Sequence, residues 1–368
     1  MCNYTMDPDG DVILTLEYPN DPFAPECGAV STPAQNPDLT ASAKSYSTPK
    51  AFSVQDIAEP EGGNKTEPVT FRVSSRHLAL ASPVFRSAFT GGWKESTKTE
   101  GELQINSEGW DTTALSIFLN TIHCKYRQVP RYLELEMLAK VAVIVDYYAA
   151  HEAMEILSPI WISNLRASLP TTTCHNRTIA LWICISWVFG DSRAFETATR
   201  TAIHHGCSNM TDFGLPIPER VIEHINRDRK LQVNSVFDGL SGLREDLLLG
   251  RKGCGVECRT MQVGAVTMLL NRTDLLNHSS EKDYQALSVG ELLNEVEAAV
   301  CPIWYGYHRK KQLTHEPHGC PGNAFDTATG SIAAELNSKW WGLNIRDYAR
   351  SATWSKYWGG QGCFLEET

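Results

Sequence analysis

The order of hydrophobic and polar residues predicts a small β-sheet in the first third of the chain. Residues 11–17 (DVILTLE) favour a strand, and in a second one Phe71 and Val73 alternate with Arg72 and Ser74. From residue 78 onward the apolar residues recur at helical spacing, with Ser82 expected as N-cap and Pro83 as first helical residue. Residues 103–105 (LQI) predict another short strand.

Most of the remaining chain shows a helical period. Helices are expected at 110–122, 134–150, 154–165, 179–189 and 193–205, and Pro218 opens a further one. Segment 179–189 is apolar on every side, which predicts a helix that is buried all round. Asp191 and Gly206 are the expected caps of the helix between them. The expected fold class is α+β, a small sheet with helices followed by a mainly α-helical C-terminal region.

Residues 18–65 break this regularity. They are rich in Pro, Ser, Ala, Thr and Asn and contain few large apolar groups. Such a segment buries too little apolar surface to offset the entropy lost on ordering. It is therefore expected to be a flexible, disordered insertion between two strands of one domain.

Composition narrows the classes of function. A net charge of -10 argues against broad binding to nucleic acid, which needs a basic surface. Residues 1–10 hold no apolar stretch, and no apolar run approaches the roughly 20 residues that cross a bilayer. We expect a cytoplasmic or nuclear protein with no membrane contact. In that reducing environment the 11 cysteines are expected to be thiols or metal ligands.

Two sets of residues carry a resemblance to a known family. The first set is Asp11, Phe71, His77, Leu78, Ser82 and Phe85. The second is the later sequence Val145-Asp146-Tyr147-Tyr148. Together they make the chain similar to BTB/POZ domain proteins, especially the divergent type common in filamentous fungi.

The resemblance implies protein–protein interaction, either by oligomerisation or as an adaptor that docks on a cullin-type ubiquitin ligase scaffold. Asp11 and His77 match family positions at the edge of a charged groove, and with Trp93 they are the expected partner-binding residues. Considered as residues alone, Asp11 and His77 could instead satisfy a buried turn, because an unpaired buried polar group is costly. Only ten residues precede Asp11, so we do not expect the N-terminal segment that many BTB dimers exchange.

The expected domain organisation has four parts. Residues 1–8 form a tail, and residues 9–168 form the BTB/POZ-like domain with its insertion at about 18–65. A helical domain at 169–250 and a cysteine-containing helical region at 251–368 follow.

Cysteine and histidine residues in the last part have the spacing of metal ligands. Cys254 and Cys258 flank a Gly-containing turn, and His318 and Cys320 would complete the Cys3His set that structural zinc accepts. His315 could replace His318. The divergent fungal BTB proteins resemble this chain in having such a cysteine turn and a later His/Cys pair. Unligated thiols and a redox-sensitive Cys254–Cys258 pair are the alternatives.

Other residues suggest structure rather than chemistry. His204 and His205 fall at an expected helix end, where their positive charge would suit the helix dipole. Tryptophans near the C-terminus indicate either packing of a small core or a ligand pocket. They are Trp304, Trp340, Trp341, Trp354 and Trp358.

The motifs GxxxxGK[ST], HExxH, GxSxG and GxGxxG do not occur in the sequence, so we do not expect an enzyme. The expected function is protein–protein interaction through a BTB/POZ domain. The alternatives are a zinc-stabilised helical scaffold and a transcription-associated regulator whose BTB domain mediates self-association.

Overall fold

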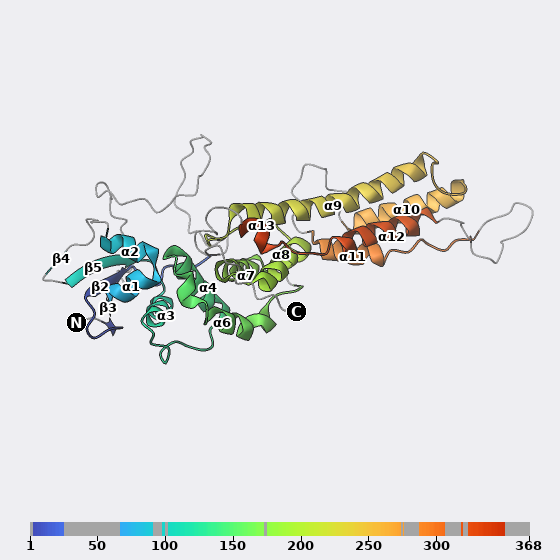
Figure 1. Cartoon of the computed structure of the whole chain (residues 1–368). Coiled ribbons are helices and arrows are strands. Elements are labelled where there is room, and N and C mark those ends of the chain that lie inside the picture. The colour runs from blue at the N-terminus through green and yellow to red at the C-terminus, as the bar shows by residue number, and fades with distance from the viewer. Residues whose placement is uncertain are drawn as a thin grey trace, which may run out of the picture.

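The computed structural model describes residues 3–25, 67–90, 98–99, 102–172, 175–273, 275, 287–305, 318 and 323–349. Figure 1 shows a small sheet at one end of the molecule and a long helical bundle at the other, with further helices between them. The fold is α+β with a mainly helical C-terminal region, which confirms the predicted fold class.

Among the described residues, five strands form one mixed sheet in the order β1-β3-β2-β5-β4. The strands are β1 (Tyr4–Thr5), β2 (Val12–Glu17), β3 (Val69–Val73), β4 (Lys98–Thr99) and β5 (Glu102–Glu108). β2 is antiparallel to β3, with Leu14 opposite Phe71, and parallel to β5, with Leu14 opposite Ile105. Parallel pairing of β2 with β5 requires the chain to cross over between them. Helices α1 (Ser75–Ala81) and α2 (Pro83–Thr90) lie on that crossover.

The sheet buries one face, as the alternation at Phe71 and Val73 in β3 predicts. Val12, Leu14 and Leu16 are fully buried, and the residues between them are partly exposed. The Tyr148 ring packs beneath this region, with its centroid 4.3 Å from that of Phe85 and 5.6 Å from that of Phe118. The α+β unit therefore has an aromatic centre that joins the crossover helices to later ones.

Ser82 is the N-cap that the sequence predicted for α2. Its Oγ accepts a hydrogen bond from Phe85 N at 3.1 Å and donates one to Tyr148 O at 2.6 Å. The hydroxyl is fully buried, so both bonds replace contacts with water. One side chain thus begins α2 and ties it to the end of a distant helix.

Further helices complete the first hydrophobic core. They are α3 (Thr112–Ile122), α4 (Leu135–Tyr147), α5 (His151–Met154), α6 (Ser158–Leu165), a 3-10 turn (Arg166–Ser168), α7 (Asn176–Phe189) and α8 (Ser192–His205). Nearly every residue of α7 from Ile179 onward is buried, which confirms the prediction from its all-round apolar sequence. Asp191 Oδ1 accepts a hydrogen bond from Ala194 N at 2.8 Å and caps α8, which ends at Gly206 as predicted.

A second core lies in the helical bundle. Its helices are α9 (Glu219–Leu248), α10 (Val256–Arg272), α11 (Val289–Glu297) and α12 (Ala324–Ser338), and α13 (Ile345–Ala349) returns to α8. Helix α9 contributes Val221 and Ile225 to the first core and, from Val233 onward, supplies the second. The cores therefore meet within α9, whereas the sequence placed boundaries after residues 168 and 250. Helices α7 and α8 complete the first core because α4 covers the apolar surface of α7.

The junction between the cores contains two buried side chains that the sequence did not interpret in this way. His204 is fully buried and stacks on Trp340 with ring centroids 4.1 Å apart. Burial lowers the pKa of His204 to about 4, so it is neutral rather than the positive helix-end residue that we expected. Arg229 is also buried and donates hydrogen bonds to Gly206 O at 2.8 Å and Leu287 O at 3.0 Å.

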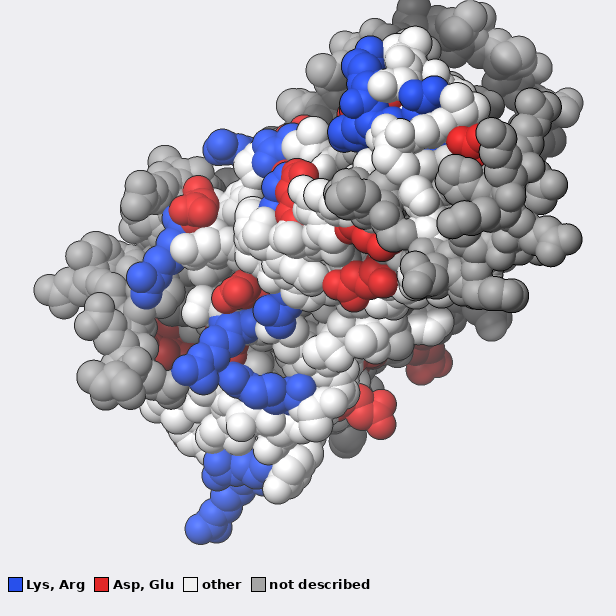
Figure 2. Space-filling view, turned by 90° about the vertical axis from the view of Figure 1, so that its right-hand side faces the viewer, with Lys and Arg blue, Asp and Glu red and all other residues white. Residues whose placement is uncertain are grey.

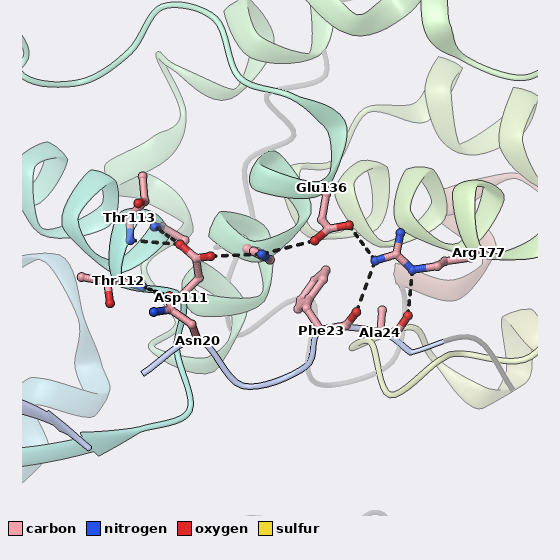
Figure 3. Close-up of polar contacts among 10 residues, drawn as sticks. Asn20, Phe23, Ala24, Asp111, Thr112, Thr113, Glu136 and Arg177 are labelled. Carbon is pink, nitrogen blue, oxygen red and sulfur yellow. Dashed lines mark hydrogen bonds and ion pairs between the residues drawn. The ribbon is translucent and has the colours of Figure 1, made fainter. Parts of the chain in front are cut away.

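Residues 18–25 differ from the predicted flexible insertion, because helices hold them in place. Figure 3 shows the guanidinium of Arg177 between Glu136 and the carbonyl groups of Phe23 and Ala24. Asn20 Oδ1 accepts a hydrogen bond from Thr112 N at 3.0 Å at the start of α3. The rest of the predicted insertion, 26–65, lies outside the described residues.

Within the described part of the chain, no helix combines the length and the apolar character needed to cross a bilayer.

Candidate functional site

Asp11 satisfies the turn that begins α1. Its Oδ1 accepts a hydrogen bond from Ser75 N at 2.8 Å, and its Oδ2 accepts one from Ser75 Oγ at 2.6 Å. Burial tends to raise the pKa of Asp11, but the hydrogen bonds from Ser75 outweigh it and hold the pKa below its usual value. A carboxylate at this position therefore joins the start of β2 to the first residue of α1.

His123, rather than His77, completes that turn. Ser74 N donates to His123 Nε2 at 3.0 Å, so this ring nitrogen is an acceptor and Nδ1 carries the proton, which it donates to Leu119 O at 2.7 Å. Burial lowers the pKa of His123, consistent with a neutral ring. His77 is half-buried and stacks on His123 with centroids 5.0 Å apart.

Only part of the expected partner-binding set can therefore be placed. Asp11 and His77 both lie at α1, but the polar partner of Asp11 is Ser75. Trp93 lies outside the described residues. The sequence missed the role of His123, although its position directly after a helix end was the available signal.

The α1–α2 pair exposes apolar side chains. Leu80 is 80% exposed and Val84 is 41% exposed, although both were expected in the apolar stripe of this region. Phe85, in the same pair, is buried against Tyr148. The pair is thus fixed to the core through Phe85 and leaves two apolar side chains, Leu80 and Val84, exposed to solvent.

The second candidate site begins at the turn between α9 and α10. Gly250 and Gly253 have φ angles of 74° and 86°, in the left-handed region that favours glycine. Asp246 braces the turn through Arg251 Nε at 2.7 Å and Lys252 Nζ at 3.2 Å. The turn places Cys254 just before α10 and Cys258 in the first turn of that helix.

Three of the four predicted metal ligands meet there. The ligand atoms of Cys254, Cys258 and His318 all lie within 4.8 Å of one another. Cys254 Sγ and His318 Nε2 are 3.1 Å apart, although the residues are 64 positions apart in sequence. Cys258 is 2% exposed and Cys254 is exposed. Cys320 and the alternative ligand His315 lie outside the described residues.

Neighbouring side chains orient this cluster. Gln262 Nε2 donates to Cys258 Sγ at 3.0 Å, and Gln262 Oε1 accepts from Phe325 N at 3.1 Å at the start of α12. The Trp304 ring stacks on the His318 ring with centroids 4.3 Å apart, and His318 N donates to Trp304 O at 2.8 Å. The cluster therefore has ordered contacts on both its sulfur and its imidazole sides.

Charges on the molecular surface are mixed. Figure 2 shows several groups of Lys and Arg side chains on the face turned to the viewer, with Asp and Glu side chains between them. On the described part of that face, neither sign forms one continuous field.

Comparison of the sequence with models of known protein families found no match, and a search among curated proteins found no similar sequence.

Proposed function

We propose that this chain is a protein–protein interaction module that docks a partner through its BTB/POZ-like residues 9–168. The observation that carries the proposal is the order of elements around β2. The β2–β3 pair is followed by the α1–α2 pair, by β5 alongside β2, and then by α3 and α4. This succession of strand, strand, helices, strand and helices is the one that the BTB/POZ resemblance implies.

The outer face of the α1–α2 pair is the proposed docking surface, defined by Leu80 and Val84. Covering an exposed leucine side chain typically contributes about 1.5–3 kcal/mol to association. The surface is preorganised because Ser82 and Phe85 fix the pair to Tyr148. A rigid apolar face loses little conformational entropy when a partner covers it.

The proposed partner is a cullin-type ubiquitin ligase scaffold, for which this chain would be the adaptor. The test measures binding of the purified full-length chain to a purified cullin by calorimetry. Leu80→Asp is expected to weaken binding at least tenfold, because it buries a charge in the contact. Ile156→Asp is the matched control, because Ile156 is also 80% exposed but lies between α5 and α6. It is expected to leave the affinity unchanged.

Sedimentation of the same samples distinguishes the second mechanism, self-association. A dimer that Leu80→Asp dissociates, without cullin binding, would replace the adaptor role by self-association through the same surface. A monomer that binds no cullin, or equal effects of Leu80→Asp and Ile156→Asp, would contradict the proposed docking surface.

A further inference from the structure

We propose that Cys254, Cys258 and His318 bind one Zn²⁺ ion, which joins His318 to the α9–α10 turn. This inference does not depend on the proposed docking function. It concerns the second core rather than the α1–α2 surface.

The spacing of the ligand atoms fits a tetrahedral ion. Bond lengths of about 2.3 Å to sulfur and 2.0 Å to nitrogen place neighbouring ligand atoms roughly 3.5–3.8 Å apart. In this cluster Cys254 Sγ and His318 Nε2 are 3.1 Å apart, and all three ligand atoms lie within 4.8 Å of one another. Small side-chain adjustments therefore reach the tetrahedral geometry. Thiolate and imidazole together are a donor set that favours zinc among the common divalent ions.

The polar contacts of Cys258 favour a thiolate. Phe325 N can only donate, so it fixes the oxygen of Gln262 towards α12 and the amide NH₂ towards Cys258 Sγ. The sulfur is thus a hydrogen-bond acceptor in a site that is 2% exposed. The first turn of α10 adds the partial positive charge of a helix N-terminus, which also favours negative sulfur. Buried amide donors of this kind are typical of the surroundings of metal-bound thiolates.

The imidazole ring of His318 is also held in a fixed orientation. Stacking on Trp304 and the hydrogen bond from His318 N to Trp304 O hold the ring with Nε2 towards Cys254. Cys254 in the α9–α10 turn and His318 stacked on Trp304 therefore already lie together. An ion that joins them closes a loop of more than 60 residues, whose closure in the unfolded chain costs entropy.

The test measures the metal content of the full-length protein, purified under reducing conditions without added metal. About one zinc per chain is expected. Cys254→Ser and Cys258→Ser are each expected to lower the content at least fivefold. Cys124→Ser is the matched control, because Cys124 is an exposed thiol outside the cluster, and it is expected to retain the zinc.

Two further measurements keep the proposal open to contradiction if a cysteine variant folds poorly. Titration of metal-depleted wild-type protein with Co²⁺ is expected to give the ligand-field spectrum of tetrahedral thiolate coordination. Gln262→Leu is expected to weaken zinc binding about 10–100-fold, as loss of a second-layer hydrogen bond does elsewhere. Wild-type protein without stoichiometric zinc, an octahedral Co²⁺ spectrum, or a Cys254–Cys258 disulfide under reducing conditions would overturn the site.

Discussion

Arg177 Nη2 on α7 lies 2.7 Å from Glu136 Oε2 on α4. The same guanidinium donates from Nε to Ala24 O at 2.8 Å and from Nη2 to Phe23 O at 3.2 Å. The hydrogen bond from Arg177 is the main reason that the pKa of Glu136 is lowered. One side chain therefore joins two helices to the segment that follows β2 (Figure 3).

Arg177→Met is expected to lower the free energy of unfolding by about 1–3 kcal/mol, because it leaves partly buried acceptors without their donor. Urea unfolding at neutral pH measures the change. Arg227→Met is the control, because Arg227 is 57% exposed and pairs with its neighbour Asp228, and it is expected to change stability by less than about 0.5 kcal/mol. Equal effects of the two substitutions would contradict the anchoring role of Arg177.

The loss caused by Arg177→Met is also expected to depend on pH. The folded pKa of Glu136 lies below its ordinary value of 4.5, so its contribution is present above that value and disappears as the pH falls through the lower folded pKa. The difference between wild type and variant should therefore shrink in acid, as measured by urea unfolding at a series of pH values.

Ser82→Ala is expected to lower the free energy of unfolding by about 1–3 kcal/mol, because Phe85 N loses its cap and the buried Tyr148 O loses a donor. Chemical denaturation measures this loss. Ser87→Ala is the matched control, since the exposed Ser87 Oγ donates to Pro83 O within α2. A smaller effect for Ser82→Ala than for Ser87→Ala would show that the link to Tyr148 adds no stability.

The sequence predicted those features of the fold that depend on interactions between residues close together in the chain. The alternation in β3, the all-round apolar α7 and the Asp191 cap each depend on residues close together in sequence. The ligand types and turn glycines around Cys254 similarly indicated the metal candidate before its geometry was known.

The features that the sequence did not predict depend on contacts between residues that are far apart in the chain. The fixed position of residues 23–24 depends on Arg177, more than 150 residues away, and nothing in the composition of that segment indicates it. The buried state of His204 likewise depends on Trp340, which reaches it from the end of α12. Helix α9 serves two cores because the neighbours of its apolar face change along its length.

The neutral state of His204 predicts a loss of stability in mild acid. The unfolded chain takes up a proton below its ordinary pKa of 6.5, whereas the folded pKa is about 4, so stability falls as the pH drops between these values. Besides burial, the groups that act on the pKa of this ring are Trp341 O, His205, Arg200 and the side chain of Gln232. Between pH 7 and pH 5, His204 is expected to contribute a loss of about 2 kcal/mol.

His204→Phe isolates this contribution, because phenylalanine keeps a ring against Trp340 but cannot titrate. Urea unfolding of both proteins at pH 7 and pH 5 gives the two pH-dependent changes. The change should be smaller in the variant, with some dependence left from His205, whose pKa burial also lowers. Equal changes in the two proteins would show that His204 is not held neutral in the folded state.

Gly342 is expected to be important for packing the segment between α12 and α13 against α8. A Cβ atom added there would overlap the backbone oxygen of Glu196, and the next residue, Leu343, donates its N–H to Thr199 Oγ1 at 2.8 Å. Gly342→Ala must therefore displace backbone, at an expected cost of about 1–3 kcal/mol in the free energy of unfolding.

Gly242→Ala provides the opposite expectation for the same chemical change. Gly242 lies inside α9, and a Cβ atom there would meet nothing within 4 Å. Alanine should stabilise the helix by roughly 0.5–1 kcal/mol, because glycine loses more backbone entropy on folding. Thermal and urea unfolding of both variants measure the contrast. A neutral Gly342→Ala would mean that the segment carrying Trp340 can move away from α8, and the burial of His204 would then lose its structural basis.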